Sequence, residues 1–330
     1  MKIGALYALL SIITWAIISV ITRFCIVYLE ANILVFATLQ IFSAGVALLL
    51  IRKPVTREGW RSGVKYSWLY TILQICRNFF LAAVYLYITS TETSLLINGE
   101  IVVTTVFAYI FFKRRPHASN IFGMIVIMVG IVLFIQSLPE AIQLRVSVLM
   151  SAVIIASCTR AIVVEKTTIA SPDTTTRQKC GISGFTMFWG GIIVMSALTV
   201  IAIGEHIFAP GFFDSHPSWF YLPRIEDILH PTTIVSACLT GFMLTSLSTY
   251  LYYATLQTAT AETFMTFRAF QPMLTYGLES LVAVYAINLK PDLDIKDYIL
   301  GCVIILGSFL ILLMPPRRTK QLEPKQYMTD

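Results

Sequence analysis

Four ionisable side chains lie deep inside long apolar stretches of the sequence. Arg77, Glu100, Arg268 and Glu279 each fall within a run of mostly apolar residues that is long enough to cross a bilayer. A charge at the bilayer centre costs about 2.5 to 3.5 kcal/mol on insertion scales, and such residues mark substrate or ion pathways. A guanidinium can bind a carboxylate through two parallel hydrogen bonds, and a glutamate can hold a cationic group or a coupling proton. These residues therefore predict a polar cavity inside a membrane protein.

Helical spacing groups several of these residues on one face. Arg268, Gln271, Thr275 and Glu279 are spaced i, i+3, i+7 and i+11, which places them on a single stripe of a helix. Trp15 shares a polar stripe in the first apolar stretch and is a candidate for stacking on a ring or a cation. The predicted cavity is lined by Trp15, Arg77, Glu100, Arg268, Gln271, Thr275 and Glu279.

Pro272 interrupts the same stripe. It is the only one of the 13 prolines within a predicted span, and there it removes a backbone hydrogen bond and kinks the helix. We predict a hinge at Pro272, and a static kink that only shapes packing is the alternative.

An alternative interpretation is that the buried charges have only a structural role. In that interpretation Arg77 pairs with Glu100 and Arg268 pairs with Glu279, and the pairs only tie helices together. Two further arginines, Arg23 and Arg160, lie near predicted helix ends, from which they are expected to reach the headgroups.

Membrane-spanning helices must position these residues. The chain has 330 residues, 57% hydrophobic and 13% charged, with a mean hydropathy of +0.77, which excludes a separate soluble catalytic domain. Long unbroken apolar runs exclude an outer-membrane barrel, whose strands would alternate. An all-α membrane protein of ten helices is predicted, with spans near residues 3–28, 32–51, 67–88, 93–112, 119–137, 146–164, 181–204, 233–254, 259–286 and 296–314.

The basic residues orient these helices. The ends and loops on one side hold 16 of the 24 lysines and arginines, the other side holds 4, and the remaining 4 lie within spans. Because cytoplasmic loops carry the excess of positive residues, both termini are predicted to be cytoplasmic, in a multi-pass protein of the cell inner membrane. The net charge of +6 is explained by this asymmetry, so nucleic acid is not an expected partner.

The two halves of the chain show an ordered internal similarity. A shift of 170 residues superposes Thr91-Glu92-Thr93 on Ala261-Glu262-Thr263, each at the start of a long apolar helix. Five helices per copy would insert the second copy upside down, which is typical of alternating access around a midplane site. Two inverted five-helix repeats are predicted, at residues 1–137 and 144–314, followed by a cytoplasmic tail at residues 315–330.

The chain resembles the drug/metabolite transporter superfamily in its ten-helix form with two EamA-type repeats. The residues that carry the resemblance are Trp15-Ala16, the run from Leu86 to Asn98, Lys113-Arg114-Arg115-Pro116, Gly123, Gly130, the run from Ala259 to Pro272, Gly301 and Gly307. The first repeat has Val102 where the second has Pro272, and this departure leaves the subfamily open. The resemblance implies a transporter of small metabolites, some members being similar to carriers of S-adenosylmethionine.

Enzyme signatures in the sequence are few. Gly181-Ile182-Ser183-Gly184 resembles the nucleophile site of rhomboid proteases, but every histidine lies in a loop, so no intramembrane base is expected for Ser183. No zinc motif or phosphate-binding loop is present in the sequence. We predict a transporter that is not an enzyme and needs no metal or cofactor.

A site that holds arginine, glutamate and aromatic side chains suits a zwitterion. Arg77 and Arg268 would bind the anionic group, Glu100 and Glu279 the cationic group or a proton, and Trp15 would stack. The predicted substrate is an amino-acid-like metabolite, with S-adenosylmethionine or a related nucleoside-type metabolite as the alternative. Protons or a counter-substrate are candidate coupling partners. An alternative from another class is a non-transporting membrane partner or lipid-handling protein, whose buried charges are only structural.

Overall fold

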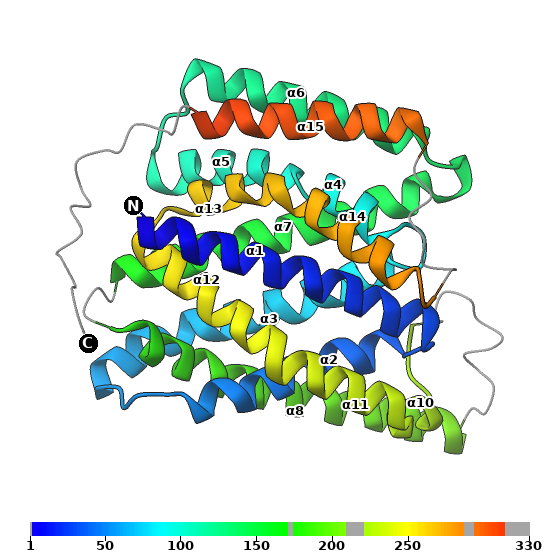
Figure 1. Ribbon diagram of the computed structural model, residues 1–330. Helices are drawn as coiled ribbons and strands as arrows, with labels where there is room; N and C mark the ends of the chain where they lie inside the picture. The colour runs from blue at the N-terminus through cyan, green and yellow to red at the C-terminus, as the bar shows by residue number, and fades with distance from the viewer. Residues whose placement is uncertain (1, 171–173, 209–220, 287–293, 314–330) are drawn as a thin grey trace.

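Helices make up almost all of the part of the chain that the structure describes. The computed structural model describes residues 2–170, 174–208, 221–286 and 294–313, and no strand occurs among them (Figure 1). The all-α prediction is confirmed for these ranges. The predicted tail at residues 315–330 lies outside the described residues.

The first half of the bundle contains six helices and a π-helical turn. They are α1 (Lys2–Arg23), η1 (Phe24–Tyr28), α2 (Ile33–Leu50), α3 (Arg57–Val84), α4 (Ser90–Leu96), α5 (Gly99–Phe112) and α6 (Ala118–Ser137). Side-chain caps fix several helix starts: Asn32 caps α2, Thr56 caps α3, and Thr89 with Glu92 forms a capping box at α4. These oxygens accept hydrogen bonds from N–H groups that have no partner inside the helix.

The described part of the second half contains two very long helices, α7 (Glu140–Ala170) and α8 (Thr176–Phe208), followed by shorter elements. The shorter elements are α10 (Ile225–Leu229), α11 (Pro231–Leu239), η3 (Thr240–Thr245), α12 (Ser246–Thr258), α13 (Ala261–Phe267), η4 (Arg268–Phe270), α14 (Gln271–Val282) and α15 (Ile295–Leu313).

Seven helical stretches in the described ranges are long and apolar enough to cross a membrane. They are Gly4–Tyr28, Ile33–Leu50, Ser90–Phe112, Ala118–Ser137, Glu140–Ile169, Thr176–Phe208 and Pro231–Thr258. They match seven of the ten predicted spans. The third, ninth and tenth predicted spans correspond to α3, α13 with α14, and α15, which are not among the seven.

Two predicted continuous spans are broken at matching positions. The stretch 93–112 is divided between α4 and α5 at Ile97 and Asn98, and the stretch 259–286 is divided between α13 and α14 by the 3-10 turn η4. The helix is therefore interrupted at η4, about one turn before Pro272, where the sequence predicts a kink. Pro272 lies in the first turn of α14, where a missing N–H costs nothing.

The bundle has a middle formed by helices from both halves. Figure 1 shows α6 beside α15 at one edge and α2, α8 and α11 toward the opposite edge. Between them α3 packs on α7, and α1 packs on α12 and α14. The predicted cavity residues lie on α1, α3, α5 and α14 and in η4.

Two glycines allow α6 and α15 to approach closely. A Cβ atom added at Gly123 would lie 2.7 Å from the carbonyl oxygen of Gly307, and one added at Gly307 would lie 3.0 Å from that of Gly123. Small residues at a helix crossing permit this kind of backbone contact in membranes.

Gly123→Val is expected to lower the free energy of unfolding by about 1 to 3 kcal/mol, because the side chain must push the two backbones apart. Gly204→Ala is the control, since nothing lies within 4 Å of the added Cβ and the exchange removes a poor helix former. Unfolding of the purified variants in denaturing detergent measures both. Equal stabilities for Gly123→Val and the wild type would refute the close crossing.

Candidate functional site

Three arginines surround one tryptophan in the middle of the bundle. The indole ring of Trp15 lies 4.1 Å from the Cζ atom of Arg77, 5.2 Å from that of Arg160 and 5.7 Å from that of Arg268, measured to the ring centroid. All four side chains are buried, and each guanidinium is at cation–π distance. We name Trp15, Arg77, Arg160, Arg268 and Glu100 the Trp15 cluster.

Arg77 is held by neutral groups. Its Nε donates to Ser157 Oγ on α7 at 2.6 Å. The neighbouring amides of Gln74, Asn78 and Gln40 form a chain of hydrogen bonds from α3 to α2, at 3.1 and 2.9 Å. Arg77 is therefore positioned by polar side chains and has no carboxylate bound to it in the described part of the chain.

Arg160 joins the cluster from α7. Its Nη1 donates to Gln74 Oε1, and its Cζ lies 4.9 Å from the ring centroid of Tyr252 and 5.7 Å from that of Tyr70. The prediction that Arg160 reaches the headgroups is wrong. Helix α7 extends to Ala170, six residues beyond the predicted end, so Arg160 lies about 15 Å from that end at 1.5 Å per residue.

Arg268 forms the one carboxylate pair of the Trp15 cluster. Its Nη1 donates to Glu100 Oε2, and its Nε and Nη2 donate to Gln271 Oε1 at 3.1 and 3.0 Å. The break between α13 and α14 places this arginine in η4, beside the N-terminal turn of α5. The structural pairing of Arg77 with Glu100 and of Arg268 with Glu279 is therefore wrong.

Several buried polar atoms of the site have no hydrogen-bond partner among the residues that the structure describes. They are Arg77 Nη2, Arg160 Nε, Glu100 Oε1 and Gln271 Nε2. A buried donor or acceptor without a partner costs about 1 to 3 kcal/mol. Two guanidinium donors, an amide donor and a carboxylate acceptor are thus available to a ligand.

Two predicted cavity residues, Glu279 and Thr275, form hydrogen bonds with α4 and not with the Trp15 cluster. Glu279 accepts from Arg23 Nη1, from the backbone N–H groups of Ser90 and Thr91 at 3.0 and 3.1 Å, and from Thr91 Oγ1 at 2.7 Å. Thr275 Oγ1 lies 3.0 Å from Ser94 Oγ on α4. The stripe on α14 therefore divides, with Gln271 at the Trp15 cluster and with Thr275 and Glu279 against α4.

Arg23 is the ion-pair partner of Glu279, and the sequence did not reveal this pairing. It was expected to reach the headgroups, but it is 8% exposed and pairs with Glu279. The chain continues past Arg23 as the π-helical turn η1, so the arginine is not at the end of the helical segment.

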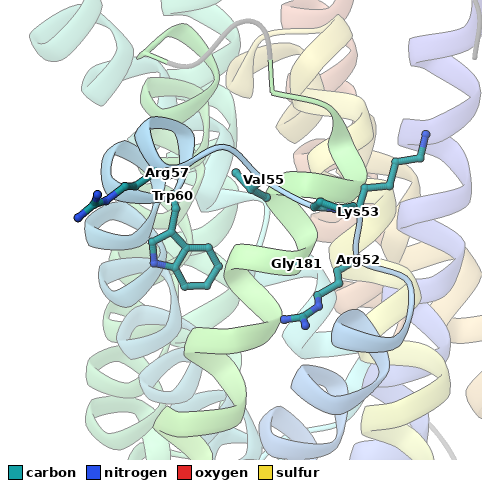
Figure 2. Close-up of a pocket in the computed structure, with 7 residues that line it drawn as sticks. Arg52, Lys53, Val55, Arg57, Trp60 and Gly181 are labelled. Atoms are coloured by element: carbon teal, nitrogen blue, oxygen red, sulfur yellow. The ribbon is translucent and has the colours of Figure 1, made fainter.

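A pocket with basic residues lies elsewhere, at the connection between α2 and α3. Its volume is about 490 Å³, and it is lined by Arg52, Lys53, Pro54, Val55, Arg57, Trp60 and Gly181. Figure 2 shows the side chains of Arg52, Lys53 and Arg57 pointing in different directions. They do not converge on one ligand, and none of the predicted cavity residues lines this pocket.

Ser183, the candidate nucleophile, lies in a hydroxyl cluster. Its Oγ is 2.6 Å from Tyr253 Oη and 3.4 Å from Ser67 Oγ. Neither group is a general base of the kind that a serine nucleophile needs.

Comparison with known proteins bears on the first half of the chain. The model of the EamA-like transporter family matches residues 2–136. The resemblance found in the sequence is thus confirmed over these residues, and together with the apolar helices it supports a multi-pass membrane protein.

No curated protein matches this sequence. Among the solved structures 28 chains match, including one titled "Crystal structure of protein" with a TM-score of 0.54 and 12% sequence identity. That alignment covers 94% of this chain and 98% of the other. At this identity the likeness establishes the fold alone.

Proposed function

We propose that the protein is a secondary transporter that moves a small amino-acid-like metabolite by alternating access, with the Trp15 cluster as its substrate site. The observation that carries the proposal is the set of buried, unpartnered polar atoms on Arg77, Arg160 and Glu100 around one indole ring. In membrane proteins such groups mark substrate pathways.

The broken helices support the transport part of the proposal. Discontinuous helices at corresponding positions of two repeats commonly flank the midplane site of secondary transporters. The break at Ile97 and Asn98 and the break at Arg268 to Phe270 agree with the 170-residue shift found in the sequence. Two inverted five-helix repeats at residues 1–137 and 144–314, ten spans in all, are part of the proposal. So are cytoplasmic termini, a location in the cell inner membrane and coupling to protons or a counter-substrate.

The free atoms match the two ends of an amino acid. Its carboxylate would bind a free guanidinium donor, Arg77 Nη2 or Arg160 Nε, through a charge-assisted hydrogen bond. Its ammonium group would bind Glu100 Oε1, the carboxylate oxygen that Arg268 leaves free. Glu279 has no place in this arrangement, because its two oxygens are already occupied.

S-adenosylmethionine is the second candidate, favoured by the aromatic side chains at the site. The rings of Trp15, Tyr70 and Tyr252 all lie within 5.7 Å of the Arg160 guanidinium. Aromatic faces bind sulfonium-type cations and stack on purines.

Arg77→Gln is expected to abolish substrate binding without unfolding the protein, because Arg77 has neutral partners and leaves no carboxylate unpaired. A ligand at 100 times its dissociation constant adds about 2.7 kcal/mol of stability. We would measure thermal shifts of the purified protein with amino acids and S-adenosylmethionine, and uptake into proteoliposomes.

Arg52→Gln, at the exposed pocket of Figure 2, is the matched control and should keep the full shift. A folded Arg77→Gln protein that binds and transports like the wild type would refute the site. No shift and no uptake with any compound would favour a non-transporting partner or lipid-handling protein.

A further inference from the structure

The buried charges of the bundle do not balance at the Trp15 cluster. Arg23 pairs with Glu279, and Arg114 pairs with Glu165 at another place in the bundle. Three arginines remain around Trp15, and Glu100 is the one carboxylate paired there. The cluster thus carries an excess of two positive charges within the described residues.

Burial makes this excess costly. Arg77, Arg160 and Arg268 are at most 2% exposed, and a charge at the bilayer centre costs about 2.5 to 3.5 kcal/mol. Ser157, Gln74 and Gln271 accept hydrogen bonds from the guanidiniums but bring no negative charge. The aromatic faces offset part of the cost, because each cation–π contact contributes about 0.5 to 2 kcal/mol.

A neutral zwitterion leaves the imbalance unchanged, because its ammonium group adds the charge that its carboxylate removes. A ligand with two acidic groups lowers the imbalance by one even when it also carries an ammonium group. The free donors belong to two different guanidiniums, Arg77 Nη2 on α3 and Arg160 Nε on α7, so each is available to one acidic group. Glu100 Oε1 remains available for the ammonium group.

We infer that the substrate is an amino-acid-like metabolite with a net negative charge, whose two acidic groups bind Arg77 and Arg160. This inference rests on the proposed transport function and specifies its substrate class. Arg160 is then a specificity-determining residue, because it adds the second positive charge that a neutral amino acid does not use.

Pairs of ligands that differ by one charge test this inference on the full-length protein. Glutamate is compared with glutamine, and aspartate with asparagine, in thermal-shift titrations and in proteoliposome uptake. The acidic member of each pair is expected to bind at least about tenfold more tightly, which is about 1.4 kcal/mol. In Arg160→Gln this preference should fall to about twofold, whereas Arg52→Gln should keep it. Arg160→Lys, which restores the charge, should recover most of the preference and covers the case in which Arg160→Gln does not fold.

The possible failures are distinguishable. Glutamine or asparagine binding as tightly as its acidic counterpart overturns the inference and leaves a transporter of neutral amino acids. Glutarate binding as tightly as glutamate also overturns it, because the ammonium group then contributes nothing and the substrate is a plain dicarboxylate. If no compound of the panel, including S-adenosylmethionine, binds or is transported, the proposed function fails as well.

Discussion

Glu279→Gln is expected to lower the free energy of unfolding by about 3 to 5 kcal/mol, because removing one partner of a buried ion pair leaves the other charge uncompensated. Glu279 is 1% exposed and binds Arg23 together with the first turn of α4. The amide can replace only some of the hydrogen bonds that the two carboxylate oxygens accept.

Two comparisons complete this test. Glu140→Gln, an exposed carboxylate in the first turn of α7, should change stability by less than about 0.5 kcal/mol. Glu279→Gln should also keep the ligand-induced shift, since Glu279 contacts α4 and not the Trp15 cluster. A stable Glu279→Gln protein that no longer binds substrate would instead return Glu279 to the cavity, as the sequence predicts.

The sequence revealed which residue types are buried but not their partners. Charges in apolar runs are conspicuous, so Arg77, Glu100, Arg268 and Glu279 could all be named from the chain alone. Helical spacing placed Arg268 and Glu279 on one stripe, but it contains no information on which neighbouring helix each residue faces. That choice depends on the breaks in the fourth and ninth spans and on how α4, α5 and α14 pack.

The length of α7 explains why the sequence did not place Arg160 in the cluster. Hydropathy ends the sixth span near residue 164, where Glu165 and Lys166 follow, and this boundary puts Arg160 one turn from solvent. The helix in fact continues to Ala170, and Glu165 is buried in a pair with Arg114. A charged residue beyond an apolar run therefore did not mark the end of the helix here.

The predicted repeat rests on a physical signal in the sequence. Thr91-Glu92-Thr93 and Ala261-Glu262-Thr263 both open short helices that end at a break. Polar helix starts can be recognised from capping chemistry, whereas the breaks themselves follow apolar residues such as Ile97 and Phe267 and have no comparable signal.

Trp15→Leu is expected to lower the free energy of unfolding by about 2 to 4 kcal/mol, because three buried guanidiniums lose the aromatic face that they share. Trp15→Phe keeps a smaller ring and should cost about half as much. Trp189 on α8, which is 44% exposed, supplies the control: Trp189→Leu should change the stability by less than about 1 kcal/mol.

Ligand binding separates packing from charge in this series. A bound anion compensates the charge of the same arginines. A saturating acidic substrate should therefore raise the free energy of unfolding of Trp15→Leu by more than it raises that of the wild type. Unfolding in denaturing detergent with and without the ligand measures this difference. If leucine is tolerated as well as phenylalanine, the hydrogen bonds that the arginines donate to Ser157, Gln74 and Gln271 are sufficient to hold them. The indole would then only fill space, and an anion would be the one group still needed to balance the cluster.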